Sequence, residues 1–149
     1  MIDSLINSFD RNLEACKSEI NAFTDEANLW KVVAHLNNSS GNLALHIAGN
    51  LQHFFGSVIG KDDYKRDRNA EFELKDVPRE KLIQELDATK ISIKKTLENI
   101  SPEELKMEFP INVLGQGWTT EQFFIFLHGH LSYHLGQINS LRRFLEQQN

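Results

Sequence analysis

Two histidines four residues apart, His130 and His134, have the spacing in this sequence that points most directly to chemistry. Apolar residues around them recur every three or four positions, which predicts a helix. Residues four apart lie one above the other on a helix, so both imidazoles point from its apolar face. Buried neutral imidazoles need partners for their ring nitrogens. A shared metal ion is one solution, and hydrogen bonds to core carbonyls or water are the other.

His46 is a third candidate ligand. It lies beside the apolar stripe of another predicted helix, near the N-terminal end of that helix. Three imidazoles from two helices leave one coordination position open, which is typical of catalytic and not of structural zinc sites. All-nitrogen ligation suits Zn, Ni or Cu. We expect zinc because it is the most available, with nickel as the alternative.

Other polar side chains are candidates for supporting this site. Ligand histidines usually donate their second N–H to a carboxylate, a carbonyl or water. Asn50 and Gln137 lie within one turn of the candidate ligands, although each could be an ordinary polar residue on a helix face. His53 follows His46 by seven residues and lies nearly on the same face of the predicted helix. It either faces a substrate or lies at the rim of the site. His128 points away from the other two histidines of its helix.

Several catalytic patterns are absent from the sequence. It has no Gly-rich phosphate loop, no Ser-His-Asp arrangement and no Cys-x2-Cys pair. The residues between His130 and His134 are Leu131, Ser132 and Tyr133, so the His-Glu-x2-His of zinc peptidases is also missing. This argues against a peptidase.

Four segments with helical periodicity must position these residues. They cover 2–23, 40–59, 78–100 and 119–145. Each predicted helix is marginal alone and must bury its stripe against the others. The sequence therefore predicts an all-α, four-helix bundle in a single domain, 1–149.

The connections between these helices are uneven. Segment 61–77 is long and highly charged, and 101–118 opens with a capping box for a short helical turn. Residues 107–118 are expected to make a short extended excursion. Connections this long are unusual in a simple up-down bundle. They predict a crossover connection, loops that shape a site, or both.

Composition excludes several classes. With 40% hydrophobic and 25% charged residues the chain is globular, and its net charge of -5 argues against a general nucleic-acid or membrane-surface binder. The single cysteine, Cys16, cannot form an intrachain disulfide and is expected to be buried. No signal-peptide pattern and no membrane-length apolar run occur, so a cytoplasmic location is expected.

The histidine pattern resembles the DinB/YfiT-like superfamily. The resemblance rests on His46 early in the second helix and on the late motif formed by His130, His134, Gly136 and Gln137. The phrases at 49–53, 64–72 and 132–139 look like an uncharacterised branch of that superfamily. The likeness extends over essentially the whole chain.

This resemblance implies a four-helix bundle with a crossover connection, a divalent metal ion on the three histidines, and a homodimer. Some members of the superfamily are thiol transferases that use bacillithiol, mycothiol or similar thiols. Others are described as metal-dependent hydrolases, and many have no known activity. The fold and the metal site therefore carry over more directly than any one reaction.

Two functions follow as hypotheses. The first is an enzyme that activates water or a low-molecular-weight thiol toward a small-molecule substrate. In it, Arg66 and Arg68 could bind an anionic thiol, unless their charged segment is simply solvated surface with internal Asp–Arg pairs. The second is a non-catalytic metal-binding or stress-related module. A bundle without any metal is the remaining alternative.

Overall fold

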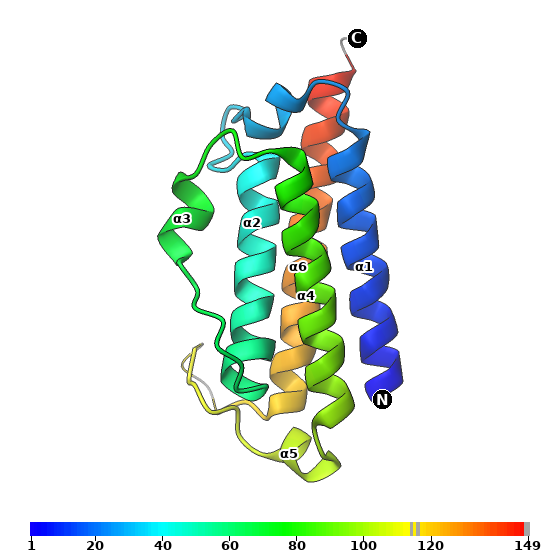
Figure 1. Cartoon of the computed structure of the whole chain (residues 1–149), viewed down its shortest axis with the longest axis vertical. Coiled ribbons are helices and arrows are strands. Elements are labelled where there is room, and N and C mark those ends of the chain that lie inside the picture. The colour runs from blue at the N-terminus through cyan, green and yellow to red at the C-terminus, as the bar shows by residue number, and fades with distance from the viewer. Residues whose placement is uncertain (114, 116, 148–149) are drawn as a thin grey trace.

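Four long helices make up most of the described part of the chain, as Figure 1 shows. The computed structural model describes residues 1–113, 115 and 117–147. The long helices are α1 (Ile2–Ala22), α2 (Ser40–Leu51) with its direct continuation η2 (Gln52–Ile59), α4 (Arg79–Asn99) and α6 (Thr120–Glu146). Short helices lie in the connections: η1 (Glu26–Trp30), α3 (Arg68–Glu73) and α5 (Pro102–Lys106). The described residues contain no strand, which confirms the predicted all-α fold.

Side-chain caps begin several helices where the sequence predicts them. At α2, the Ser39 side chain accepts a hydrogen bond from a first-turn backbone N–H. Thr119 and Gln122 form a capping box at α6, and Ser101 and Glu104 form another at α5. These caps fix where α2 and α6 begin, and hence the height at which their histidines lie in the bundle.

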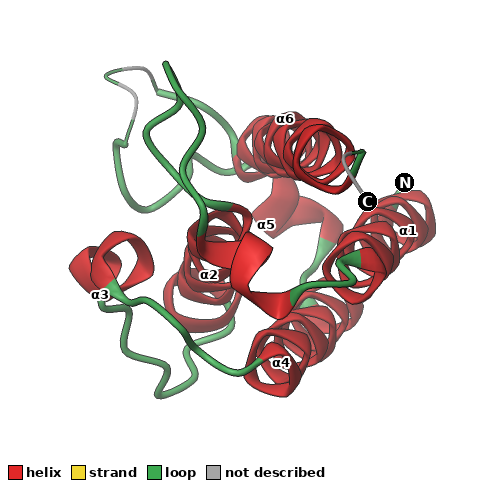
Figure 2. Cartoon of the chain, turned by 90° about the horizontal axis from the view of Figure 1, so that it is seen from above, coloured by secondary structure: helices red, strands yellow, loops and turns green. Residues whose placement is uncertain are grey.

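The long helices form a ring in the order α1, α4, α2, α6 (Figure 2). In Figure 1, α1 and α6 run upward while α2 and α4 run downward. The neighbours α2 and α4 are therefore parallel, and the chain must return along the whole bundle between them. Residues 60–78 make this return and carry α3 on the outside of α2. This is the predicted crossover connection.

The predicted apolar stripes meet inside the ring. Phe55 and Phe124 are fully buried and stack with their ring centroids 4.2 Å apart. Cys16 is also completely buried, as expected. Burial, aided by the nearby Glu19 carboxylate, raises the pKa of its thiol to about 12. None of the described helices combines the length and the apolar character needed to cross a membrane.

The second half of the predicted 40–59 helix is a π-helix, η2. Its end is marked by a hydrogen bond of 2.8 Å from the Gly60 N–H to the carbonyl of Phe55, five residues back. Such a turn accommodates one residue more than an α-helix of the same length, which apolar periodicity does not reveal.

Two connections also differ from expectation. Segment 61–77 contains the helix α3, which begins where the Asp67 side chain accepts a hydrogen bond from the Ala70 N–H. The expected extended excursion at 107–118 is reduced, among its described residues, to one isolated bridge between Glu108 and Thr119. Residues 114 and 116 of that expectation lie outside the described part of the chain.

Candidate metal centre

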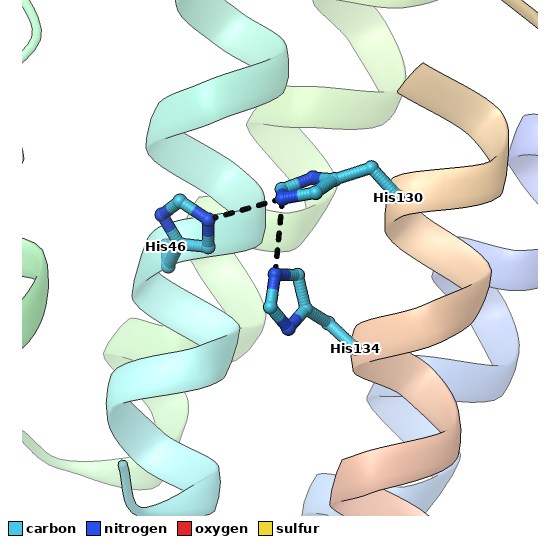
Figure 3. Close-up of side chains that lie close together, drawn as sticks. All are labelled: His46, His130 and His134. Carbon is cyan, nitrogen blue, oxygen red and sulfur yellow. Dashed lines mark hydrogen bonds between the residues drawn. The ribbon is translucent and has the colours of Figure 1, made fainter. Parts of the chain in front are cut away.

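His46 of α2 and His130 and His134 of α6 turn their rings toward one another between the two helices (Figure 3). The Nε2 atom of His130 lies 3.4 Å from Nε2 of His46 and 3.0 Å from Nε2 of His134. The candidate ligand atoms of all three lie within 4.8 Å of one another. In a tetrahedral zinc site with Zn–N bonds of about 2.0–2.1 Å, ligand nitrogens are about 3.3 Å apart. The cluster therefore has the dimensions of a metal site.

A buried carboxylate holds the second nitrogen of His46. Nδ1 of His46 lies 2.9 Å from Oε1 of Glu71, and only 8% and 6% of the two side chains are exposed. An ionised carboxylate only accepts hydrogen bonds, so Nδ1 is the donor and Nε2 keeps its lone pair for the cluster. Arg66 donates to Glu71 from Nε at 2.8 Å and from Nη2 at 2.9 Å. This bidentate pair balances the carboxylate charge.

The helix α3, which carries Glu71, is anchored to α2 through backbone carbonyls at its C-terminal end. Asn42 donates from Nδ2 to the carbonyl of Glu71 at 2.9 Å and to that of Leu74 at 2.8 Å. Asn42 itself is completely buried. The crossover connection is thus tied to the same helix that presents His46.

The ring of His134 is oriented by a hydrogen bond to Gln137. Nδ1 of His134 lies 2.7 Å from Oε1 of Gln137, whose Nε2 reaches the hydroxyl of Tyr133 at 3.4 Å. Nδ1 is therefore the donor, and Nε2 of His134 also keeps its lone pair. The lone pairs of His46 and His134 then both face Nε2 of His130, which carries at most one proton. A cation between the three nitrogens satisfies all of them, so the donor set fits a metal ion.

Protonation equilibria favour the metal-binding state. Burial lowers the pKa of His130 to about 4, and the neighbouring His134 and His46 add to this effect. Burial also lowers the pKa of His134. For Glu71, burial opposes ionisation, but the hydrogen bonds from Arg66 and His46 outweigh it and hold its pKa below the ordinary value. At pH 7 the imidazoles of His130 and His134 are thus neutral, and the Glu71 carboxylate is ionised.

Sequence reasoning missed Glu71, although a signal for it was present. Gly49 follows His46 by three residues inside a helix, where glycine is unfavourable. A Cβ atom at Gly49 would collide with the Glu71 carboxylate. Only glycine lets this carboxylate approach α2, and an unexplained glycine in a helix indicates such a close approach.

The remaining candidates are spread around the cluster. Asn50 is buried, and its Oδ1 has no hydrogen-bond partner among the described residues. The Nδ1 atom of His46 binds Glu71 instead. His53 packs its ring on Phe54 with a centroid distance of 4.9 Å, and burial followed by the charge of Arg66 lowers its pKa.

The charged segment does not present its two arginines together. Arg66 faces inward to the buried carboxylate, whereas Arg68 is exposed and lies 5.2 Å from the ring centroid of Phe72. His128 lies apart from the cluster as expected, in edge contact with Phe9 at 5.1 Å.

An apolar hollow adjoins the cluster on α6. Phe126 lies one turn before His130, with the two rings nearly parallel and their centroids 6.3 Å apart. The opposite neighbour of Phe126 is Trp118, at 5.3 Å. Together with Gly117, Gln122 and Ile125 they line an open hollow of about 730 Å³. The described lining carries no charged side chain.

Comparisons with known proteins give a family. No curated protein matches the chain, and no solved structure does. One family model matches residues 1–149, the full length of the sequence. The chain therefore belongs to the family described as "Protein of unknown function (DUF1572)".

Proposed function

We propose that this protein is a metal-dependent enzyme of the DinB-like superfamily that acts on a small molecule. The observation that carries the proposal is the cluster of His46, His130 and His134, with three Nε2 atoms turned to one point. Three nitrogen donors suit zinc, with nickel as the alternative. The crossover bundle and the histidine spacing support the superfamily.

Three protein ligands leave room for one more, which supports a catalytic site over a closed structural one. A divalent ion there would act as a Lewis acid that lowers the pKa of a bound water or thiol near neutral pH. This supports hydrolysis, or transfer of a low-molecular-weight thiol to an electrophilic substrate.

The chain's own residues would orient the site and receive the substrate. Glu71 and Gln137 hold the rings of His46 and His134 in one tautomer. Arg66 acts through Glu71, which is a role other than the binding of an anionic thiol. The apolar hollow beside Phe126 suits the carbon skeleton of a small substrate.

The metal content of loaded protein tests the first part of this proposal. Wild-type protein should retain one equivalent of zinc or nickel per chain after gel filtration. His46→Ala, His130→Ala and His134→Ala should each lose most of it. His35→Ala is the matched control, because His35 is exposed in a loop. Unchanged metal content in the three cluster variants would refute the proposal.

Cobalt substitution tests the chemistry. We expect low-molecular-weight thiols to change the visible spectrum of the cobalt-loaded protein, or hydrolysable esters to be turned over, and His130→Ala to abolish the effect. If metal is bound but neither effect occurs, the non-catalytic metal-binding module is the correct description.

A further inference from the structure

One side of α6, on the outside of the bundle, carries no charge over most of its length (Figure 2). This outer face of α6 consists of the exposed residues between positions 123 and 140, namely Ile125, Gly129, Ser132, Tyr133, Gly136 and Ser140. None of them is charged, although charged residues make up 25% of the sequence. On α4, by contrast, Lys81, Lys94 and Glu98 are all exposed. Because exposed sides of helices are normally charged, the outer face of α6 is suited to contact with another surface.

The outer face also exposes large apolar side chains. Ile125 is 55% and Tyr133 64% exposed, and Phe144, one turn beyond Ser140, is 51% exposed. Ile125 also lines the hollow beside Phe126, so the apolar surface continues into that hollow. Depletion of charge together with exposed aromatic residues is typical of the centre of a protein–protein interface.

Two glycines lie in the middle of the outer face. A Cβ atom at Gly129 or Gly136 would have no neighbour within 4 Å, so no contact within the described chain requires glycine there. Gly49 differs, because the Glu71 carboxylate occupies the place of its side chain. Glycine is unfavourable in a helix interior, but a small residue lets the backbone of a second helix come close. The two glycines therefore indicate a helix that packs on α6 from outside.

The outer face is complementary to itself when two copies of α6 run antiparallel. If Gly129 lies opposite the partner's Gly136, the spacing along the helix brings Ile125 opposite the partner's Ser140. The same register brings Tyr133 opposite a serine of the partner. Each large side chain then meets a small one, and the glycines meet one another. A second copy of this chain therefore fits the face.

The ends of α6 add charge complementarity to this register. Glu121 lies in the first turn of α6 and Arg143 in its last turn. In the antiparallel pair, the partner's Arg143 lies at the level of Gln122, next to Glu121, so opposite charges meet at each end. In a parallel pair, the two Arg143 side chains would meet, and their like charges would repel each other. Charge therefore favours the antiparallel arrangement.

We propose that two copies of this chain form a two-fold symmetric dimer through the outer faces of α6, with Gly129 of one copy opposite Gly136 of the other. The association does not require the metal ion. Because the partner's Arg143 lies at the level of Gln122, the C-terminal part of the partner's α6 covers the outer side of the apolar hollow. Each subunit thus contributes a wall to the hollow that adjoins the histidine cluster of the other.

Sedimentation at micromolar protein concentration tests the association, and wild type should sediment as a dimer. Gly136→Lys should weaken the association about 100-fold or more, because it buries an unpaired charge in the contact. The new side chain has open space within its own subunit, so the bundle stays folded, which circular dichroism verifies. Ala88→Lys is the matched control, because Ala88 is a small exposed residue on α4, and this variant should remain a dimer.

Cross-linking through cysteines tests the register. Cys16 is completely buried, so an introduced thiol is the accessible one. Ile125→Cys and Ser140→Cys are treated with a short bismaleimide, each alone and as a mixture. Covalent dimers should form in the mixture and in neither variant alone, because positions 125 and 140 meet only across the antiparallel pair. Ile91→Cys, at a position 68% exposed on α4, is the control and should form none with either variant.

A monomer at every concentration would overturn the proposal, and so would a Gly136→Lys variant that dimerises like wild type. Covalent dimers of Ile125→Cys alone or of Ser140→Cys alone would overturn the antiparallel register. Metal content enters none of these measurements, so failure of the proposed function is recognised separately, by the metal analysis of the three histidine variants.

Discussion

Replacement of Glu71 tests the link between the crossover connection and the cluster. Glu71→Gln keeps an oxygen that can accept from Nδ1 of His46 but removes the negative charge, and Glu71→Ala removes both. Because 8% and 6% of the two side chains are exposed, water cannot readily replace the lost partner. Arg66 would also lose the carboxylate that it contacts at 2.8 and 2.9 Å.

Partners of ligand histidines typically contribute about 10- to 100-fold to metal affinity. We expect Glu71→Gln to weaken zinc binding about tenfold and Glu71→Ala about 100-fold. These factors correspond to about 1.4 and 2.7 kcal/mol of binding free energy. The order of the two variants follows from the hydrogen bond that glutamine can still accept.

Competition with a chromophoric chelator measures these affinities. Glu73→Gln is the matched control, because Glu73 is exposed on the same short helix and its replacement changes the net charge by the same amount. Circular dichroism of the metal-free variants establishes that the bundle remains folded. Wild-type zinc affinity in both Glu71 variants would refute the reasoning. A loss of zinc affinity in Glu73→Gln equal to that in Glu71→Gln would show that the effect is a general one of net charge.

Further predictions concern the fold around the site. Gly49→Ala should lower the melting temperature and the metal affinity, because the new methyl group collides with Glu71. In Gly129→Ala the new methyl group has no neighbour within 4 Å, so this variant should stabilise α6 by about 0.5–1 kcal/mol. Equal melting temperatures of the two variants would contradict this prediction. Cys16 should resist a disulfide reagent at pH 8 in the folded protein and react in guanidinium chloride, because its thiol is buried and its pKa is about 12; fast reaction of the native protein would exclude a closed core. Burial opposes ionisation of Glu19, but hydrogen bonds from α6 hold its pKa below the ordinary 4.5. Its contribution to stability is therefore complete above pH 4.5 and is lost as the pH falls through the lowered value. Glu19→Gln should cost about 1 kcal/mol of unfolding free energy at pH 7 and progressively less in acid, as measured by urea denaturation; a difference independent of pH would show that the charge is not involved.

The elements that sequence predicts best are those governed by local rules. Helical periodicity locates α1, α2, α4 and α6, because each helix must bury one stripe. A capping residue also locates the start of α2, and a capping box that of α6. The pairing of His130 with His134 follows from four-residue spacing alone. His46 depends on how α2 meets α6, and this geometry is not encoded within either helix.

Contacts between segments that are distant in the chain could not be predicted from the sequence. Glu71 lies 25 residues from His46 and belongs to a six-residue helix that would be unstable in isolation. Its charge made it look like part of a solvated segment. Gly49 is the local trace of this contact, but glycine in a helix does not reveal which residue approaches it.

The anchoring of α3 by Asn42 has a consequence for the protein's local stability. A helix of six residues held by a few hydrogen bonds can open without unfolding the bundle, so its amide hydrogens should exchange faster than those of α2. Opening would also remove Glu71 from His46. Thermodynamic reciprocity then requires that any ligand that favours His46 in its hydrogen bond to Glu71 slows amide hydrogen exchange in α3. Amide exchange in this outer helix would report occupancy of a site that its backbone does not touch.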